Sequence, residues 1–266
     1  MSLAQVSGGD PTKKKKNWAA DDMKSLYKKV MSADGKPAFQ IVKNAADKVG
    51  IDRGLLMSSA FQEGMNMGIA RPDEISDAYS RLTEAQQAEF PVDGFYNYGL
   101  DTFGDRAKEL TKYLPKDFDK RYTTFDAVQD NKQHTKVKTA AFRTNEDALI
   151  AKGAMMRAEM DTVNHYADKL GVKLDTKALD YFTLASYNGG FGNAKIMMDE
   201  YVKAGDKGAF IDTGSTSRKG IHKNIQPRME NIDVANSLLG PEAVAPSTPF
   251  NSQDGLSKAL TQGRPQ

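Results

Sequence analysis

The stretch that decides the fold is residues 144–171, which read TNEDALIAKGAMMRAEMDTVNHYADKLG. Thr144 is suited to cap a helix, Asp147 forms a partial capping box with it, and Gly171 is suited to end the helix. Between them, apolar and small residues recur at alternating four- and three-residue steps, which places them on one helical face. The pattern predicts a long helix at the centre of a helical core, with the stripe Leu149, Gly153, Met156, Met160, Val163, Ala167 and Leu170.

Helical spacing of apolar residues continues along most of the chain. A second helix is predicted from Asp175 to about Tyr187, and a late helix carries Ile225, Met229 and Ile232. No pair of segments alternates clearly enough to predict two strands. The sequence therefore predicts an all-α fold.

The composition narrows the possible functions. The chain has 266 residues, 39% of them hydrophobic, with no cysteine, three histidines and a net charge of +2. Disulfides and thiolate chemistry are therefore excluded, and a zinc site is unsupported. The nearly balanced charge argues against nucleic acid as a partner. No stretch is long and apolar enough for a membrane span or a signal peptide, so we expect synthesis in the cytoplasm.

The two ends of the chain differ in composition from the middle. Residues 1–17 contain two glycines, a proline and the run Lys13 to Lys16, and residues 241–266 are rich in proline, glycine, serine and glutamine. Such segments bury too little apolar surface to offset the entropy of ordering. We expect a flexible basic arm at 1–17, one domain at 18–240 and a flexible tail at 241–266.

A carboxyl group ends the apolar face of a helix that follows Gly50. Asp52 is a plausible N-cap, and Leu56, Ala60 and Glu63 are spaced to share one helical face. A carboxyl group in a poorly hydrated setting has a raised pKa, as a general acid requires near neutral pH. From this helix alone, a glutamate exposed at a helix end remains the alternative to a catalytic Glu63.

A glycine-rich segment follows the helix that begins at Asp175. Residues 184–194 read LASYNGGFGNA, so Tyr187 and Asn188 stand where a turn would let the backbone approach a ligand closely. A tight connection between two helices would use the same glycines. The segment is not a phosphate loop, because no strand precedes it and no Gly-Lys-Ser/Thr follows it.

Residues 184–194 resemble the Leu-Ala-Ala-Tyr-Asn-Ala-Gly-Pro-Gly segment of soluble lytic transglycosylases, lysozyme-like enzymes that cleave peptidoglycan between N-acetylmuramic acid and N-acetylglucosamine. Residues 55–65 are similar to the family helix that ends in its catalytic glutamate. Residues 98–104, YGLDTFG, fall where the family has Gly-Leu-Met-Gln, and residues 224–229, NIQPRM, resemble its late Asn-Tyr-Val-x-Arg-Val helix. These segments occur in the family's order across residues 40–240.

The resemblance implies a lysozyme-like fold and a mechanism with one carboxyl group. Glu63 would protonate the leaving oxygen and then accept the proton of the muramoyl 6-hydroxyl as a 1,6-anhydro ring closes. The scheme requires no metal or cofactor. It implies that Tyr187 lies near the cleavage site. The substrate-binding residues would be Asn188, Tyr98, Gly99, Asp101 and Phe191. Phe95, Tyr96 and Phe191 are candidates for packing against sugar rings and rank below Glu63 and Tyr187.

The sequence also departs from the family pattern. Gly64 replaces the serine after the glutamate, Asp101-Thr102 replaces the glutamine after Gly-Leu, and Ile225 stands where a tyrosine is usual. Residues 73–90 are predicted to be an inserted helix. Phage members of the superfamily often diverge in these ways, which favours a virion-associated or lysis enzyme that reaches the cell wall without its own signal. Its partners would be peptidoglycan strands and, through the tails, other virion proteins.

Two alternatives remain open. A goose-type lysozyme would hydrolyse the same bond, with a second carboxylate positioning water; Asp93, Asp101 and Asp105 are the candidates, although aspartates in such a loop are more often turn formers. A virion protein that kept the fold and lost activity is the second alternative, since Gly64 and the missing glutamine alter the expected site.

Overall fold

The computed structural model describes residues 23–25, 29–62, 76–129 and 134–240. The predicted arm at 1–17 and tail at 241–266 lie outside the described residues. The α-helices are α2 (Ala38–Val49), α3 (Arg53–Ala60), α5 (Glu84–Glu89), α6 (Gly94–Tyr98), α7 (Phe103–Leu110), α8 (Asn145–Lys169), α9 (Thr176–Gly189), α10 (Phe191–Lys203), α11 (Lys207–Thr213) and α12 (Lys219–Leu239). The 3₁₀ helices and strands are η2 (Tyr79–Arg81), η3 (Thr111–Tyr113), η4 (Phe118–Arg121), β1 (Val30–Met31), β2 (Lys36–Pro37), β3 (Val92–Asp93), β4 (Tyr122–Val128) and β5 (Lys136–Phe142).

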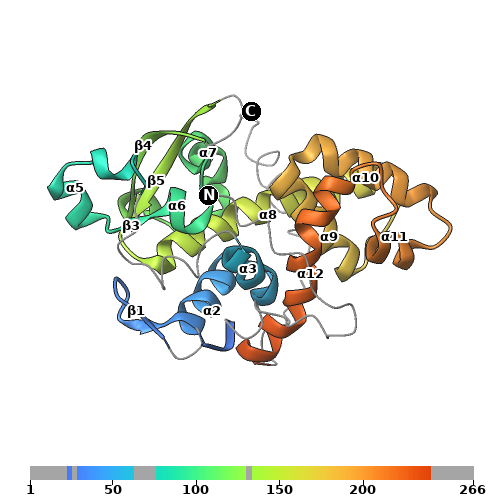
Figure 1. Ribbon diagram of the computed structural model, residues 1–266, viewed down its shortest axis with the longest axis horizontal. Helices are drawn as coiled ribbons and strands as arrows, with labels where there is room; N and C mark the ends of the chain where they lie inside the picture. Colours follow the sequence, from blue (N-terminus) through green and yellow to red (C-terminus); the bar gives the residue numbers. More distant parts are fainter. Residues whose placement is uncertain (1–22, 26–28, 63–75, 130–133, 241–266) are drawn as a thin grey trace, which may run out of the picture.

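Helix α8 crosses the middle of the molecule, with the β4–β5 hairpin on one side and α9 to α11 on the other (Figure 1). The Thr144 side chain accepts a hydrogen bond from the Asp147 backbone N–H at 3.1 Å, and Gly171 follows the helix in a left-handed conformation at φ +67°. The predicted stripe is buried apart from the half-buried Leu170. The long central helix is therefore confirmed, together with its two ends.

The all-α prediction is too narrow. The described residues are mostly helical, but they also form two small antiparallel sheets. Strands β3, β5 and β4 form the larger sheet in that order, and Tyr122 pairs with Phe142 at the base of the β4–β5 hairpin. Burial alternates in the first half of β5, where Val137 and Thr139 are buried. From Ala140 onward every β5 residue is buried, so the alternation that marks a strand lasts only four residues.

Helix α7 lies close against β5. A Cβ atom added to Gly104 would lie 2.8 Å from the backbone oxygens of Lys138 and Thr139, so only glycine allows this approach. The Asp105 carboxylate accepts a hydrogen bond from the Lys138 backbone N–H at 2.9 Å. These contacts fix the sheet next to the turn that contains Gly99.

The predicted helix at 73–90 is wrong for its described part. From residue 76 onward, the chain forms η2 and then α5, separated by an extended Leu82. Thr83 starts the new helix through a capping box with Gln86. The Tyr79 hydroxyl donates to the Phe90 carbonyl at 2.8 Å, and both rings join a small core with Phe125. A second capping signal thus divides what looked like one helix.

Helices α3 and α12 run in opposite directions against each other. Asp52 caps α3 as predicted, accepting from the Leu55 N–H at 2.8 Å, and its carboxylate also lies 3.4 Å from the Asn236 side-chain nitrogen near the end of α12. Toward the other end of α3, the Ser58 hydroxyl donates to the Arg228 carbonyl at 2.6 Å. The predicted late helix is confirmed as α12.

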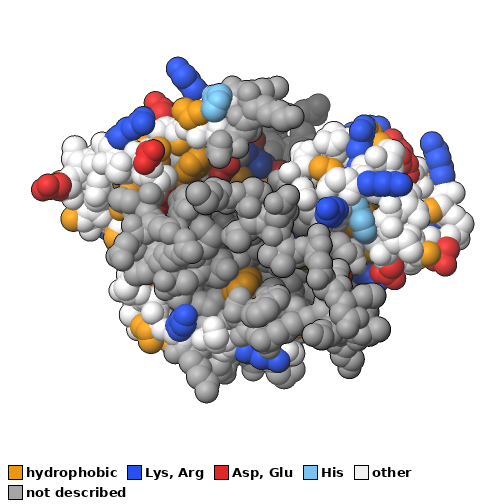
Figure 2. Space-filling view, viewed as in Figure 1, with side chains coloured by type: hydrophobic (Ala, Val, Ile, Leu, Met, Phe, Trp, Pro, Cys, Tyr) orange, Lys and Arg blue, Asp and Glu red, His pale blue; other side chains and the backbone are white. Residues whose placement is uncertain are grey.

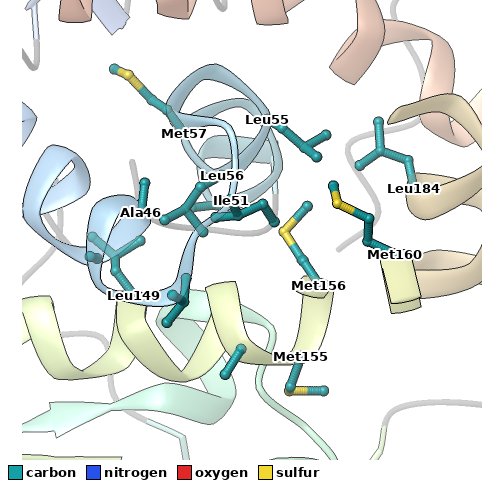
Figure 3. Close-up of a cluster of buried hydrophobic side chains, with 14 of the residues drawn as sticks. Ala46, Ile51, Leu55, Leu56, Met57, Leu149, Met155, Met156, Met160 and Leu184 are labelled. Atoms are coloured by element: carbon teal, nitrogen blue, oxygen red, sulfur yellow. The ribbon is translucent and has the colours of Figure 1, made fainter. Parts of the chain in front are cut away.

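The core joins these helices to α8. Figure 3 shows Leu55 of α3 pointing toward Met156 and Met160 of α8 and Leu184 of α9, while Leu56 lies on the side of Ala46 and Leu149. The side chains shown are buried. The methionines fill the space between three helices that cross at different angles, as flexible side chains do well. This core fixes the ends of α3 and α9 relative to each other.

Charges of both signs are interspersed on the described surface that Figure 2 shows. This distribution agrees with the nearly balanced charge of the chain. Within residues 23–25, 29–62, 76–129 and 134–240, no helix has the length and apolarity of a membrane span.

Candidate functional site

The sequence motifs at 98–104 and 184–194 meet at the Tyr187 hydroxyl. This hydroxyl lies 3.2 Å from the Gly99 carbonyl oxygen, to which it donates, and 3.0 Å from the Lys152 ammonium, from which it accepts. The Lys152 ammonium also donates to the Tyr98 carbonyl at 3.2 Å and lies 4.6 Å from the centre of the Tyr187 ring. Two segments that are 88 residues apart in the chain therefore share one hydrogen-bonded cluster.

Lys152 is the residue that the sequence interpretation missed. It projects from the middle of α8 and is fully buried. A buried ammonium is tolerated only where hydrogen-bond acceptors or opposite charges surround it, and here the Tyr98 carbonyl and the Tyr187 hydroxyl accept from it. The signal was present, because Lys152 stands next to Gly153 on the apolar face that Leu149 and Met156 define.

Tyr98 and Gly99 form a rigid part of this cluster. Tyr98 is 1% exposed, and its hydroxyl donates to the Asn145 side-chain oxygen at 2.6 Å at the start of α8. Burial raises the pKa of the Tyr98 hydroxyl well above its usual range, and the charge of Asp34 adds to this effect. Gly99 adopts φ +60°, which favours glycine at this turn. Tyr98 is thus placed to hold the turn, while the half-buried Gly99 and Tyr187 lie closer to the surface.

The other predicted binding residues are half-buried around the same helix ends. The Asp101 carboxylate accepts from the Gln129 side chain at 3.0 Å. The Asn188 side chain donates to the Leu184 carbonyl at 2.8 Å within α9, whose last turn includes both Tyr187 and Asn188. The Phe191 ring packs edge-on against Tyr166 with 5.8 Å between centroids. None of these three contacts joins Asn188, Asp101 or Phe191 directly to the Tyr187 hydroxyl.

Two of the candidates for a second catalytic carboxylate, Asp93 and Asp105, already accept hydrogen bonds from the backbone. Asp93 is 1% exposed and accepts from the backbone N–H groups of Ser76 at 2.8 Å and Phe95 at 3.0 Å, which is the work of a turn-forming aspartate. Asp105 holds β5 as described above. Phe95 is half-buried against the small core, and the Tyr96 side chain lies outside the described residues. These contacts favour a structural role for Asp93 and Asp105 over the positioning of water.

Ser186, the residue before Tyr187 on α9, contacts an ion pair between α7 and α8. The Arg106 guanidinium of α7 lies 2.8 Å from one Glu159 oxygen of α8, and the Ser186 hydroxyl donates to the other. Both oxygens of this largely buried carboxylate therefore have partners. The group joins three helices directly behind Tyr187, which suits a role in fixing α9.

Glu63, the predicted acid/base, lies outside the described residues, and the last described residue before it is Gln62. The geometry nevertheless fixes where the chain leaves α3. From Ser58, which contacts Arg228, α3 continues toward the beginning of α12. A Cβ atom added to Gly189 would lie 2.5 Å from the Ile221 side chain, so the end of α9 also lies against the beginning of α12. The chain therefore leaves α3 on the side of the molecule where α9 ends.

Among the residues that the structure describes, no group of three histidine, aspartate or glutamate side chains is arranged to hold a metal ion. The hydrogen bonds inside the cluster around Tyr187 fix the Tyr187 hydroxyl relative to the turn at Gly99.

The chain was compared with known proteins at the level of sequence and of structure. No family model, no curated protein and no solved structure matches it.

Proposed function

We propose that this protein is a peptidoglycan lytic transglycosylase, with Glu63 as the acid/base and Tyr187 next to the cleaved bond. The observation that carries the proposal is the contact between Tyr187 and Gly99, which brings together two of the four segments that resemble the family. Contact between Ser58 and Arg228 pairs the other two. Segments that resemble a family's site only by chance have no reason to pair in space.

The contacts of Lys152 support this proposal. Lys152 orients the Tyr187 hydroxyl and the Tyr98 carbonyl from inside the core, so that the turn at Gly99 keeps a fixed position. A fixed position matters because a misplacement of about 1 Å can cost roughly 100-fold in rate. Lys152 is thus a positioning residue, and Glu63 carries the proton transfer.

Cleavage of purified peptidoglycan by three forms of the full chain tests the proposal. We expect wild type to release soluble muropeptides and Glu63→Gln to lower the rate by about 10²- to 10⁴-fold, because the amide keeps the shape and removes the titrating proton. The matched control is Glu84→Gln, which makes the same change at an exposed site in α5.

The outcomes distinguish an enzyme that uses Glu63 from one that does not and from an inactive protein. Equal rates for wild type and Glu63→Gln would overturn the assignment of the acid/base. An absence of products from all three folded forms would support the inactive virion protein instead. Loss of activity in Glu84→Gln as well would show that the assay responds to stability and would contradict a specific role for Glu63.

A further inference from the structure

A second site lies at the opposite end of α9 from Tyr187. A pocket of about 450 Å³ opens between the start of α3, the first turns of α9, α11 and the second half of α12. It is lined by the side chains of Asp52, Lys177, Asp180, Asp212, Glu230 and Asp233, among others. The pocket is large enough for a small organic ligand.

Asp180 is the feature that requires an explanation. Its side chain lines the pocket, and the residue is 6% exposed. Among the described residues it has neither a hydrogen-bond donor nor an ion-pair partner, whereas other buried carboxylates such as Asp93 and Glu159 are bonded. A carboxyl group that lines a pocket and has no partner from the protein is free to pair with a ligand that supplies one.

The pocket carries an excess of negative charge. Five carboxyl groups line it and one ammonium, that of Lys177, which is already paired with Asp212 at 2.6 Å. Glu230 and Asp233 are exposed on α12. The charged groups around Asp180 are therefore Asp52 at the start of α3, Asp175 and Lys177 on α9, Asp212 on α11, and Glu230 and Asp233 on α12. This arrangement attracts a cation.

The remaining lining favours an organic cation over a metal ion. Ile211, Met229 and Ile232 contribute aliphatic surface to the pocket. A calcium ion would need about six to eight oxygen ligands, and no metal-binding group of acidic side chains is found in the part of the chain that the structure describes. An aliphatic chain with a charged end matches both kinds of surface.

We propose that this pocket binds a primary ammonium group on an aliphatic chain, with the Asp180 carboxylate as its counter-ion. The ammonium could belong to a free amine or to a lysine side chain of a polypeptide. The inference is independent of glycan cleavage, because it uses none of the residues around Tyr187.

Binding of the ammonium group should be coupled to the release of a proton from Asp180. Burial, reinforced by the charges of Asp52 and Asp175, raises the pKa of Asp180 to about 8, so the empty pocket holds a neutral carboxyl group at pH 7. An ammonium ligand favours the carboxylate, so its binding releases one proton from Asp180. Affinity therefore rises with pH by up to about tenfold per unit below pH 8 and levels off above it.

Isothermal titration calorimetry on the full chain tests the proposal. The probes are n-pentylamine for a free amine, Nα-acetyl-lysine methylamide for a lysine side chain, and 1-pentanol and Nα-acetyl-norleucine methylamide as their uncharged counterparts. For at least one charged probe we expect a dissociation constant on the order of 1 mM at pH 8. We also expect release of about one proton at pH 7, measured from the dependence of the heat on the buffer.

The variant Asp180→Asn should weaken binding at least tenfold. It should also fold, because an amide replaces a carboxyl group that is already neutral at pH 7. The matched control is Asp126→Asn, on the exposed side of β4, which should bind like wild type. A preference for n-pentylamine identifies a free amine as the ligand type, and a preference for the lysine probe identifies a polypeptide.

Four results would overturn the proposal, of which three concern a protein that binds at least one substance. These are equal binding by wild type and Asp180→Asn, equal binding of the charged and uncharged probes, and binding of calcium chloride without binding of either ammonium probe. A folded protein that binds none of the probes would overturn it as well.

Discussion

The two ends of α9 differ in whether the buried polar group beside them has hydrogen-bond partners. At its C-terminal end, the fully buried Lys152 has acceptors in Tyr98 and Tyr187, and the cluster holds a turn in place. Toward its N-terminal end, Asp180 is almost as buried, yet the described residues offer its carboxyl group no partner. One end is an internally completed scaffold, and the other is a pocket with an unused acceptor.

This difference suits the Lys152 cluster to positioning other residues and the Asp180 pocket to binding a ligand. A satisfied buried charge fixes geometry and gains little from a ligand, because its hydrogen bonds are already made. An unsatisfied buried carboxyl group destabilises the empty protein, and a ligand that pairs with it removes that penalty. Substitutions at the two ends should therefore change stability in opposite directions.

The largest change in stability is expected from Asp180→Asn, which should raise it. The pKa of Asp180 is about 8 in the folded protein and about 4 in the unfolded chain, so between these values the folded state binds more protons and loses stability as pH rises. The asparagine variant avoids this loss and should gain up to about 5 kcal/mol at pH 8, because each pH unit between the two pKa values costs wild type about 1.4 kcal/mol. Urea unfolding at several pH values measures the gain.

The pH dependence gives the control for this prediction. The gain should shrink as pH falls and vanish near pH 4, where the aspartate is protonated in both states. A gain that is independent of pH, or a variant less stable than wild type at pH 8, would contradict the description of Asp180 as an unpaired buried carboxyl group. Asp126→Asn should show no such trend.

A smaller change of opposite sign is expected from Tyr187→Phe. The ring remains, but Lys152 loses an acceptor and the Gly99 carbonyl loses a donor, which should cost about 1–3 kcal/mol. The comparison variant is Tyr166→Phe, which removes a hydroxyl bonded to Asp199 nearer the surface and should cost about 0–1 kcal/mol. Thermal unfolding of both variants measures these costs. A Tyr187→Phe variant as stable as wild type would contradict the proposed difference between the two ends of α9.

Local signals explain what the sequence could predict. The helix at α8 followed from a long apolar period and from residues at its two ends whose conformational preferences are strong. The cap at Asp52 was also predictable, because it depends on a backbone N–H only three residues away. Such features are decided within a few turns of chain.

Features that depend on distant segments could not be predicted in the same way. In strand β5, burial alternates for only four residues before Ala140, and every later residue of the strand is buried. Asp180 lies on α9, but its surroundings include α3 and α12, which lie far away in the sequence. Lys152 could have been noticed as a charge on an apolar face, but its partners could not have been named.

The most direct test of the central claim is incubation of purified peptidoglycan with the protein, followed by a mass measurement of any new glycan-chain ends. An intramolecular ring closure leaves 1,6-anhydromuramoyl ends, which are lighter by one water than the reducing ends left by hydrolysis. Our account predicts anhydro ends with wild type, formed much more slowly with Glu63→Gln. Reducing ends would contradict the transglycosylase mechanism and assign the chain to the hydrolases, with Asp101 as the first candidate for positioning water.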